Sequence, residues 1–288
     1  MKAASEGLWL APLRGVTVRT FRAVFGRAIR EAGFSGMYAP FIPANAGFRP
    51  SKRLFSDIMP DESVLGLELV PQVIGKDPDA LRCWCRAVKD LGYARVDLNA
   101  GCPFPMIRRK GRGSGLLRTP DVLERMIEAG CDEMGDGAFS LKVRLGVEST
   151  GDLLALMPMI NRYPLAVLTV HARTARQMYG GAPDINAFAS VRDASAVPVL
   201  YNGDATVEAR NAMVGRSFIR SLASRDDARS LLAAYCEASR SELNGDAPVL
   251  GRMKELLSYW CQEPSWRRLW PQIKICRSVC ELGMVVGM

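Results

Sequence analysis

A cysteine lies in an unusual position directly after an apolar stretch of the chain. In residues 94–105, ARVDLNAGCPFP, the apolar stretch ends at Leu98 and Asn99, and Cys102 follows between Gly101 and Pro103. Glycine and proline adopt special backbone angles, so together they fix the conformation of the loop that carries the thiol. A buried cysteine is commonly inert. A thiol held rigidly in such a loop can instead donate a proton, which is the role of a general acid.

Polar residues also mark the other short apolar stretches of the chain. They are Ala11 to Gly15 at the first stretch, Gln72 in the third, Lys142 and Arg144 in the fifth, His171 to Arg173 at the sixth and Asn202 to Asp204 at the seventh. If these stretches are the parallel strands of a barrel, their carboxyl ends gather at one rim, which is where barrels carry catalytic residues. The pattern therefore predicts one site built from many strands.

Two of these residues, Lys142 and His171, could have either a structural or a functional role. Lys142 lies inside the apolar stretch FSLKVRL, and a buried lysine must find an anion or hydrogen-bond acceptors. The alternative is a lysine that points outward at the end of a strand. His171 is the only histidine in the chain. A lone histidine is more often structural than functional, but its place at the end of an apolar stretch, with Arg173 two residues later, favours a functional role.

The seventh stretch ends in Asn202, Gly203 and Asp204. Asn-Gly is a strong turn signal, so a plain turn is one interpretation. A glycine at the end of a strand also lets backbone N–H groups approach a phosphate. Phosphate sites of barrels lie in the loops after the seventh and eighth strands, and Arg216 suits the same phosphate.

The elements that must position these residues alternate regularly. Apolar stretches at 8–12, 36–40, 71–75, 94–99, 139–145, 166–171 and 198–202 predict strands, and amphipathic stretches such as 79–92 and 119–131 predict helices between them. This alternation predicts an α/β fold, with a parallel sheet covered by helices. No Gly-x-Gly-x-x-Gly follows the first strand, which argues against a dinucleotide-binding doubly wound sheet. We therefore expect a (β/α)8 TIM barrel over residues 8–225.

The composition changes after residue 225, where no further strand pattern occurs. Residues 244–248, NGDAP, are a turn or linker signal. The remaining chain has a helical pattern that is interrupted at Pro264 and Pro271. We therefore expect a barrel domain over residues 1–225 and a small helical domain over residues 226–288.

The overall composition indicates which kinds of binding partner to expect. The 288 residues carry a formal net charge of +8, which favours a polyanion such as nucleic acid, although a basic surface can also have no such partner. We expect no signal peptide, no membrane segment and a cytoplasmic location. The eight cysteines form no Cys-x-x-Cys pair, so we expect reduced thiols and no metal site.

Six segments in order resemble the motifs of the tRNA-dihydrouridine synthase family. They are LAPLRGVTVRTFR, VPQVIG, VDLNAGCP, LKVRLG, LTVHARTARQMYGG and VPVLYNGD. Their order and spacing are similar to those of the family over about 200 residues, and six ordered motifs are far more specific than one. The weaker pattern GRMKELLSYW, followed by LW, is similar to the helical tRNA-binding domain of the subgroup that acts on position 16 of the D-loop.

The resemblance implies an FMN barrel that uses NADPH to reduce the C5–C6 bond of a uridine in tRNA. It implies that Cys102 protonates C5, and that Asn99 and Arg173 contact the substrate nucleotide. The residues that it assigns to FMN are Pro12, Leu13, Gln72, Lys142, His171, Asn202, Gly203, Asp204, Gly215 and Arg216.

A tRNA partner agrees with the charge pattern. A uridine inside folded tRNA must be flipped into a pocket to react, and docking requires phosphate contacts. Residues 108–118, RRKGRGSGLLR, lack apolar periodicity until Leu116. We expect them to form a flexible loop that faces tRNA, or simply a solvated basic loop. A monomer would suit an enzyme that embraces tRNA.

The chain departs from the family pattern between Asn202 and Gly215. Only thirteen positions separate these residues, whereas the family uses about ten more for the seventh helix and eighth strand. We therefore expect a shortened or irregular barrel at this point. This departure favours one alternative, a non-catalytic tRNA-binding relative with a decayed flavin site. A second alternative, a flavin reductase that acts on small molecules, explains the polar rim but not the basic helical tail.

Overall fold

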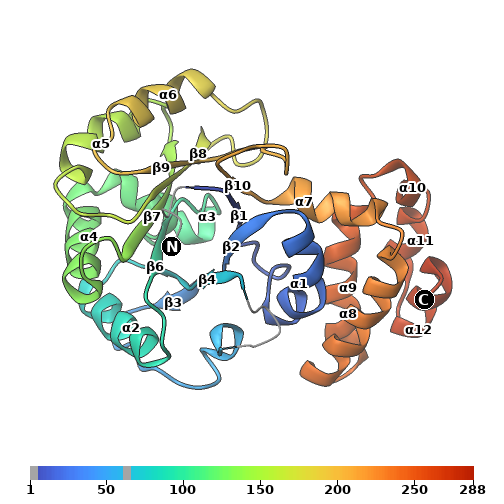
Figure 1. The fold of residues 1–288 in the computed structure, drawn as a ribbon. Coiled ribbons are helices and arrows are strands. Elements are labelled where there is room, and N and C mark those ends of the chain that lie inside the picture. Colours follow the sequence, from blue (N-terminus) through green and yellow to red (C-terminus); the bar gives the residue numbers. More distant parts are fainter. Residues whose placement is uncertain (1–5, 61–65) are drawn as a thin grey trace.

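The centre of the molecule is a sheet in which every strand pairs in parallel with its neighbours (Figure 1). A computed structural model describes residues 6–60 and 66–288. Within those ranges the strands are β1 (Leu8–Leu10), β2 (Phe34–Tyr38), β3 (Ile42–Ala44), β4 (Glu68–Val70), β5 (Gln72–Gly75), β6 (Val96–Ala100), β7 (Phe139–Gly146), β8 (Leu168–Thr174), β9 (Val199–Asn202) and β10 (Ala212–Val214). All seven predicted strands are present.

The sheet closes into a barrel through one stretch of chain. The strand order is β3-β5-β6-β7-β8-β9-β10-β1-β2-β4. Pro71 alone separates β4, at one end of this order, from β5, next to the other end. The Pro71 carbonyl still accepts a hydrogen bond of 2.9 Å from the Asp97 N–H, as in a continuous strand. The interruption between β4 and β5 therefore arises because proline has no N–H to donate. Residues 68–75 therefore act as one barrel strand, and the predicted TIM barrel is confirmed.

Helices cover the outside of the barrel between successive strands (Figure 1). They are α1 (Arg19–Glu31), α2 (Pro78–Asp90), α4 (Pro120–Met134), α5 (Asp152–Ile160) and α6 (Ile185–Asp193), with the 3-10 helix η1 (Ser56–Ile58). The short helix α3 (Pro105–Arg108) and the 3-10 helix η3 (Gly113–Arg118) follow β6, and α3 lies at the carboxyl ends of the strands. Pro120 begins α4, within the stretch 119–131 predicted as a helix, because proline is well suited to a first helical position. In α2 the Asp77 side chain accepts hydrogen bonds from the N–H groups of Asp79 and Ala80, which fixes the start of the helix.

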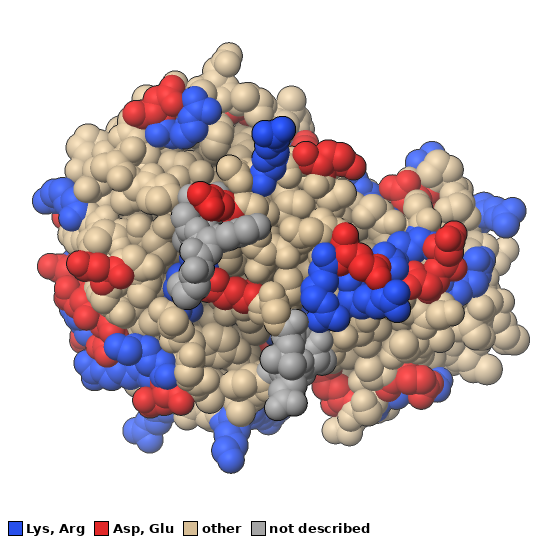
Figure 2. All heavy atoms as spheres, viewed as in Figure 1, with Lys and Arg blue, Asp and Glu red and all other residues tan. Residues whose placement is uncertain are grey.

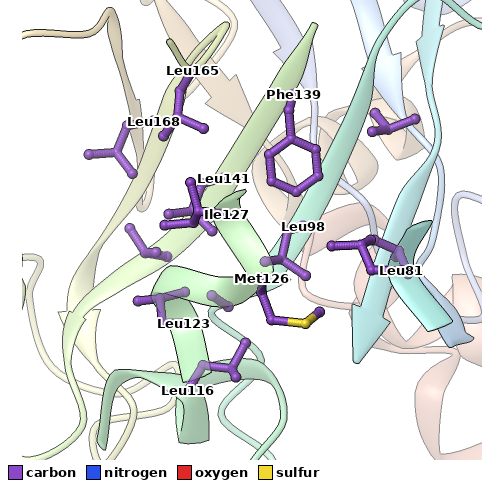
Figure 3. Packing of buried hydrophobic residues seen from close by; sticks show 14 of the residues in the cluster. Leu81, Leu98, Leu116, Leu123, Met126, Ile127, Phe139, Leu141, Leu165 and Leu168 are labelled. Carbon is purple, nitrogen blue, oxygen red and sulfur yellow. The ribbon is translucent and has the colours of Figure 1, made fainter. Parts of the chain in front are cut away.

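The largest hydrophobic cluster lies between the strands β5 to β8 and the helices α2 and α4. Figure 3 shows part of it, with Leu98, Phe139 and Leu141 from the sheet near Met126 and Ile127 from α4. All five side chains are fully buried. This packing anchors β6 and β7, the two strands that carry Asn99 and Lys142 to the rim of the barrel.

The expected irregularity between Asn202 and Gly215 affects a helix and leaves a strand in place. Residues 203–211 contain no helix, whereas β10 pairs with both β9 and β1 and completes the barrel. The Asn211 side chain accepts a hydrogen bond of 2.8 Å from the Gly7 N–H, which ties the short segment to the start of β1. The expected shortening is therefore confirmed, because the seventh helix is missing and the eighth strand, β10, has only three residues.

The C-terminal helices lie together at one side of the barrel (Figure 1). After α7 (Arg216–Ser221) and the 3-10 helix η4 (Leu222–Ser224) come α8 (Ala228–Glu242), α9 (Asp246–Trp260), α10 (Pro264–Arg267), α11 (Trp270–Ile275) and α12 (Val279–Val286). The predicted interruptions at Pro264 and Pro271 are confirmed. Phe25 of α1 contacts Tyr235 of α8 and Trp260 of α9, with ring centroids 5.7 and 6.4 Å apart. The C-terminal helices therefore share a hydrophobic cluster with the barrel.

The close contact between α4 and β7 yields a stability prediction. A Cβ atom at Gly130 would overlap the buried ring of Phe139, so Gly130→Ala should lower the free energy of unfolding by about 1–2 kcal/mol, despite the better helix propensity of alanine. Gly251 in α9 has no neighbouring atoms within 4 Å of such a Cβ. Gly251→Ala should therefore stabilise the protein by up to about 1 kcal/mol. Urea unfolding measures the free energy of unfolding of each variant. Equal effects of the two substitutions would contradict the close contact between Gly130 and Phe139.

Candidate active site

Two adjoining cavities open at the carboxyl ends of the barrel strands. The larger, of about 800 Å³, is lined by Cys102, Asn99 and Arg144 and reaches Glu255 and Tyr259 of α9. The smaller, of about 490 Å³, is lined by Arg173, Asn202, Gly203, Asp204 and Gly215. The walls of both contain Pro12, Leu13, Lys142, His171, Tyr179 and Arg216. Twelve of the thirteen predicted site residues thus gather at one rim, and the exception is Gln72.

The loop that carries Cys102 is held by the side chain of Asn99. The Asn99 Oδ1 atom accepts hydrogen bonds from the backbone N–H groups of Gly101, at 3.1 Å, and Cys102, at 2.8 Å. A glycine is required at position 101, because a Cβ there would lie 3.1 Å from the backbone of Val143. The loop conformation predicted from the Gly-Cys-Pro sequence is therefore fixed from inside the barrel.

Asn99 is oriented in turn by two buried side chains behind it. Its Nδ2 donates to Gln72 Oε1 at 2.9 Å, and Gln72 Nε2 donates to Asp97 Oδ2 at 2.7 Å. Ser140 donates to the other oxygen of Asp97 at 2.9 Å. Because a carboxylate only accepts, Asp97 fixes which way the Gln72 amide faces. Gln72 is fully buried and acts on the loop through Asn99, and its contact with a flavin stays a prediction.

The basic segment after Cys102 is folded against the loop. Residues 105–118 form α3 and η3, and the N–H and hydroxyl groups of Ser114 donate to the Cys102 carbonyl at 3.1 and 2.9 Å. A Cβ at Gly113 would lie 2.8 Å from the Cβ of Cys102. The prediction of a flexible loop was wrong, because these contacts are formed by backbone atoms and glycines that hydrophobic periodicity does not reveal.

The Cys102 thiol is only 8% exposed and faces the larger cavity. Burial raises its pKa above the ordinary value, although the neighbouring cations Arg144, Arg14 and Lys142 lower it. The thiol therefore stays protonated at neutral pH. A protonated thiol on a rigid loop is suited to donate a proton and poorly suited to act as a nucleophile.

Lys142 and His171 stand next to each other at the junction of the two cavities. Lys142 donates to Asn202 Oδ1 at 2.8 Å, and burial lowers its pKa to about 8, helped by Arg144. Burial also lowers the pKa of His171, with Arg144 and Lys142 adding to the effect, so the imidazole is neutral. The predicted partner of the buried lysine is thus an amide oxygen.

The predicted phosphate side carries a negative charge as well as positive ones. Asp204 accepts hydrogen bonds from Arg173, one of them at 3.2 Å, and pairs with Arg216 at 3.4 Å. The Arg173 bond lowers the pKa of Asp204. Gly203 and Asp204 have positive φ angles of 136° and 45°, so the turn is tight. Arg173 lines the smaller cavity and does not line the larger one that contains Cys102.

The structure gives a specific role to Arg144, which the sequence placed at the rim without one. Arg144 donates to the carbonyls of Gly101, Thr174 and Met178 at 2.9, 3.0 and 2.6 Å, and its guanidinium lies 5.4 Å from the ring centre of Tyr179. It therefore connects the Cys102 loop to the loop after β8. Its spacing of two from Lys142 in one strand places both on the same side and could have indicated this.

Residues of α9 were also missed. Glu255, Ser258, Tyr259 and Gln262 lie at helical spacing on one face of the α9 segment and line the larger cavity. No local sequence signal indicates that this face meets a cavity more than 100 residues away in the chain. It does so because α9 packs against α7, which directly follows β10.

Comparison with known proteins agrees with this geometry. Residues 9–214 match the family described as dihydrouridine synthase (Dus). A probable tRNA-dihydrouridine synthase of Rhodobacter capsulatus is 34% identical over 209 residues, which cover 71% of this chain and 62% of that protein. tRNA-dihydrouridine synthase B of Serratia marcescens is 28% identical over 198 residues (68% and 57%), and a tRNA-dihydrouridine(16) synthase of Ralstonia nicotianae is 30% identical over 203 residues (68% and 61%). The chain thus matches between 57% and 62% of the length of these relatives.

Solved structures support the fold. The old yellow enzyme from Trypanosoma cruzi superposes with a TM-score of 0.52 at 12% sequence identity, and the match covers 76% of this chain and 88% of that one. A likeness at this level of identity concerns the barrel and not its chemistry.

Other classes of site are not seen in the described parts of the chain. Residues 6–60 and 66–288 contain no group of three or more His, Cys, Asp or Glu side chains that could hold a metal ion. Over the same ranges no helix has the length and apolar character that crossing a membrane requires.

The buried carboxylate behind the loop gives a pH prediction. Burial raises the pKa of Asp97 to about 6, so the folded state binds the proton more tightly than the unfolded chain. Its contribution to stability is therefore fully present below about pH 4 and falls as the pH rises to about 6. The difference in unfolding free energy between wild type and Asp97→Asn should fall by about 3 kcal/mol across this window. Urea unfolding from pH 4 to pH 7 measures this difference. Unfolding free energies of wild type and Asp97→Asn that change with pH in parallel would contradict the pKa shift of Asp97.

Proposed function

The chain belongs to the dihydrouridine synthase family, and on this premise we propose that it reduces a uridine in tRNA to 5,6-dihydrouridine. FMN is the proposed cofactor, NADPH the reductant and the cytoplasm the location. The observation that carries the proposal is the protonated Cys102 thiol on a rigid loop, facing the same cavity as Lys142 and His171. Because the matches cover only part of the relatives, the activity of the whole protein rests on this geometry and on experiment.

The two cavities suit a flavin and a uracil side by side. Pro12 and Leu13 offer an apolar edge to both cavities, and Lys142 and the neutral His171 offer polar contacts to a flavin ring between them. Gly203 and Gly215 leave room beside the smaller cavity, where backbone N–H groups and Arg216 would meet the phosphate. Bound FMN, once reduced by NADPH, supplies the hydride for uracil C6.

The chain's own residues complete the reduction. The hydride would bring the electron pair of the new C–H bond at C6, and the electron pair of the C5–C6 π bond would move to C5. The Cys102 S–H bond breaks and its proton passes to C5, so that the thiolate remains and is reprotonated from water. One amide hydrogen of Asn99 is not used by the loop network and is available to a uracil oxygen. Arg144 positions the thiol through the Gly101 carbonyl.

The tRNA would cover the rim and the adjoining C-terminal helices. We assign residues 226–288 to tRNA binding because α9 forms part of the wall of the larger cavity. A nucleotide flipped into this cavity would touch barrel and helix together. Exposed basic residues of the tail would contribute phosphate contacts, among them Arg267, Arg268, Lys274 and Arg277. Arg252, by contrast, pairs with Glu242, and Lys254 donates to two backbone carbonyls.

A second candidate is a non-catalytic tRNA-binding relative. The observation that favours it is the Asp204 carboxylate, which engages both Arg173 and Arg216 on the predicted phosphate side and would repel a phosphate. Protein that stays colourless after FMN is added, yet binds tRNA, would favour this candidate. Protein that reduces small enones as fast without residues 226–288 would instead favour a small-molecule flavin reductase.

The proposed function has a direct test. Purified protein should be yellow and show the absorption bands of oxidised flavin. Mass spectrometry of tRNA should show dihydrouridine missing at one position in cells that lack the gene, and restored when the gene is returned. Unchanged dihydrouridine content in both strains would refute the proposal, and the position of the change identifies the uridine.

Cys102→Ala provides the mechanistic prediction. The variant should retain FMN, NADPH-dependent flavin reduction and tRNA affinity, but its rate of uridine reduction should fall by about 10²–10⁴-fold, which is typical for loss of a general acid. The exposed thiol Cys280 supplies the matched control, because Cys280→Ala should leave all four quantities unchanged. A Cys102→Ala enzyme with wild-type turnover would exclude this cysteine as the proton donor.

A further inference from the structure

A third cavity, separate from the first two, opens on the same side of the barrel. It has a volume of about 590 Å³ and lies where β3 and β5 end, between the loops that follow them. Its basic lining residues are Lys76, Arg112 and Arg125, which come from three different segments. None of the residues assigned to the flavin or the uridine lines this cavity.

The three cations have no acidic partner within residues 6–60 and 66–288. Lys76, Arg112 and Arg125 make no side-chain hydrogen bond or ion pair there, and the Nε of Arg112 is buried without an acceptor. Two arginines further along α2 behave differently. Arg82 and Arg86 of α2 pair with Asp132 and Glu133 of α4 at 3.2 and 3.0 Å. The cations at the cavity are thus available to an external anion.

The cavity also contains two carboxylates, Asp77 and Asp79, which pair with none of the three cations and leave its lining with an excess of one positive charge. The carboxylate of Asp77 is occupied as the N-cap of α2, where it accepts from two backbone N–H groups. Asp79 is exposed in the first turn of the same helix, where the positive end of the helix dipole suits its charge. Figure 2 shows a contrasting face, on which basic and acidic side chains are interspersed.

The cavity is joined to the Cys102 loop by neighbouring residues. Gly113, next to Arg112, packs directly on Cys102, and the Lys76 Nζ lies 3.8 Å from the position of a Cβ at Gly111. An anion bound here would therefore lie on the outer side of the segment that supports the thiol. A strand of RNA with one nucleotide in the larger cavity could reach this point with its backbone.

We propose that this cavity binds a backbone phosphate of the RNA strand that carries the target uridine. The inference rests on the proposed function and adds a site to it. Arg112 and Arg125 would supply N–H donors in the planar arrangement that suits a phosphate, and Lys76 would add a point charge. The site would hold the strand in register, so that the base entering the larger cavity is the correct uridine.

Substitution of the cations tests the site. Arg125→Gln and the double variant Arg112→Gln/Arg125→Gln should weaken binding of an unmodified tRNA transcript by about tenfold per residue. The slope of log Kd against log salt concentration, measured between about 50 and 200 mM KCl, should decrease by about one per residue. Arg210 is an exposed, unpaired arginine among the described residues, beside the start of β10, so Arg210→Gln controls for net charge and should change Kd by less than about twofold.

The outcomes separate the site from the proposed function. Flavin reduction by NADPH should be unchanged in all variants, which shows that the catalytic cavities are intact. Wild-type protein that binds tRNA while all variants behave like Arg210→Gln would overturn this site alone. A raised KM for NADPH with intact tRNA affinity would also overturn it and assign the cavity to a dinucleotide phosphate. Wild-type protein that binds no tRNA would overturn the proposed function together with the site.

Discussion

The site depends on a buried carboxylate in the middle of the barrel. Asp97 is completely buried and would be costly to ionise there without partners. Its partners come from the strands on either side, because the parallel register places Gln72 of β5 and Ser140 of β7 directly beside it. Through Gln72 this carboxylate fixes the orientation of Asn99, and Asn99 holds the Cys102 loop. A fully connected polar chain of this kind specifies one arrangement of the rim.

Burial also determines the electrostatics of the rim, because its charged side chains are held by partners inside the barrel. Three cations next to the catalytic cavities have fixed partners: Lys142 an amide, Arg144 three carbonyls and Arg173 the Asp204 carboxylate. They orient groups at the rim, and their charges add to the burial that keeps His171 neutral. The three unpaired cations Lys76, Arg112 and Arg125 lie further out, around the third cavity. One set of basic residues therefore positions groups in the active site, and a different set is proposed to bind the RNA backbone.

The sequence was sufficient to predict the barrel and most of the rim. Strand–helix alternation and polar residues at strand ends are local signals, and the carboxyl ends of parallel strands must meet, so twelve predicted residues line one region. The position of Gln72 behind Asn99 was not predictable, because it depends on which neighbour lies across the strand. The pairing of Asp204 with Arg173 and the folded basic segment after Cys102 depend likewise on contacts distant in sequence. The shortening of the eighth strand was indicated by the short distance from Asn202 to Gly215, and only three residues form this strand.

The central claim is that the barrel presents Cys102 as a protonated thiol. The most direct test is the pH dependence of Cys102 alkylation by iodoacetamide, followed on the peptide that contains this residue by mass spectrometry. A thiol kept neutral by burial should show a midpoint above the ordinary cysteine pKa of about 8.5, with slow alkylation at neutral pH. A midpoint below that value would mean a thiolate at neutral pH, and would contradict the assignment of Cys102 as the proton donor.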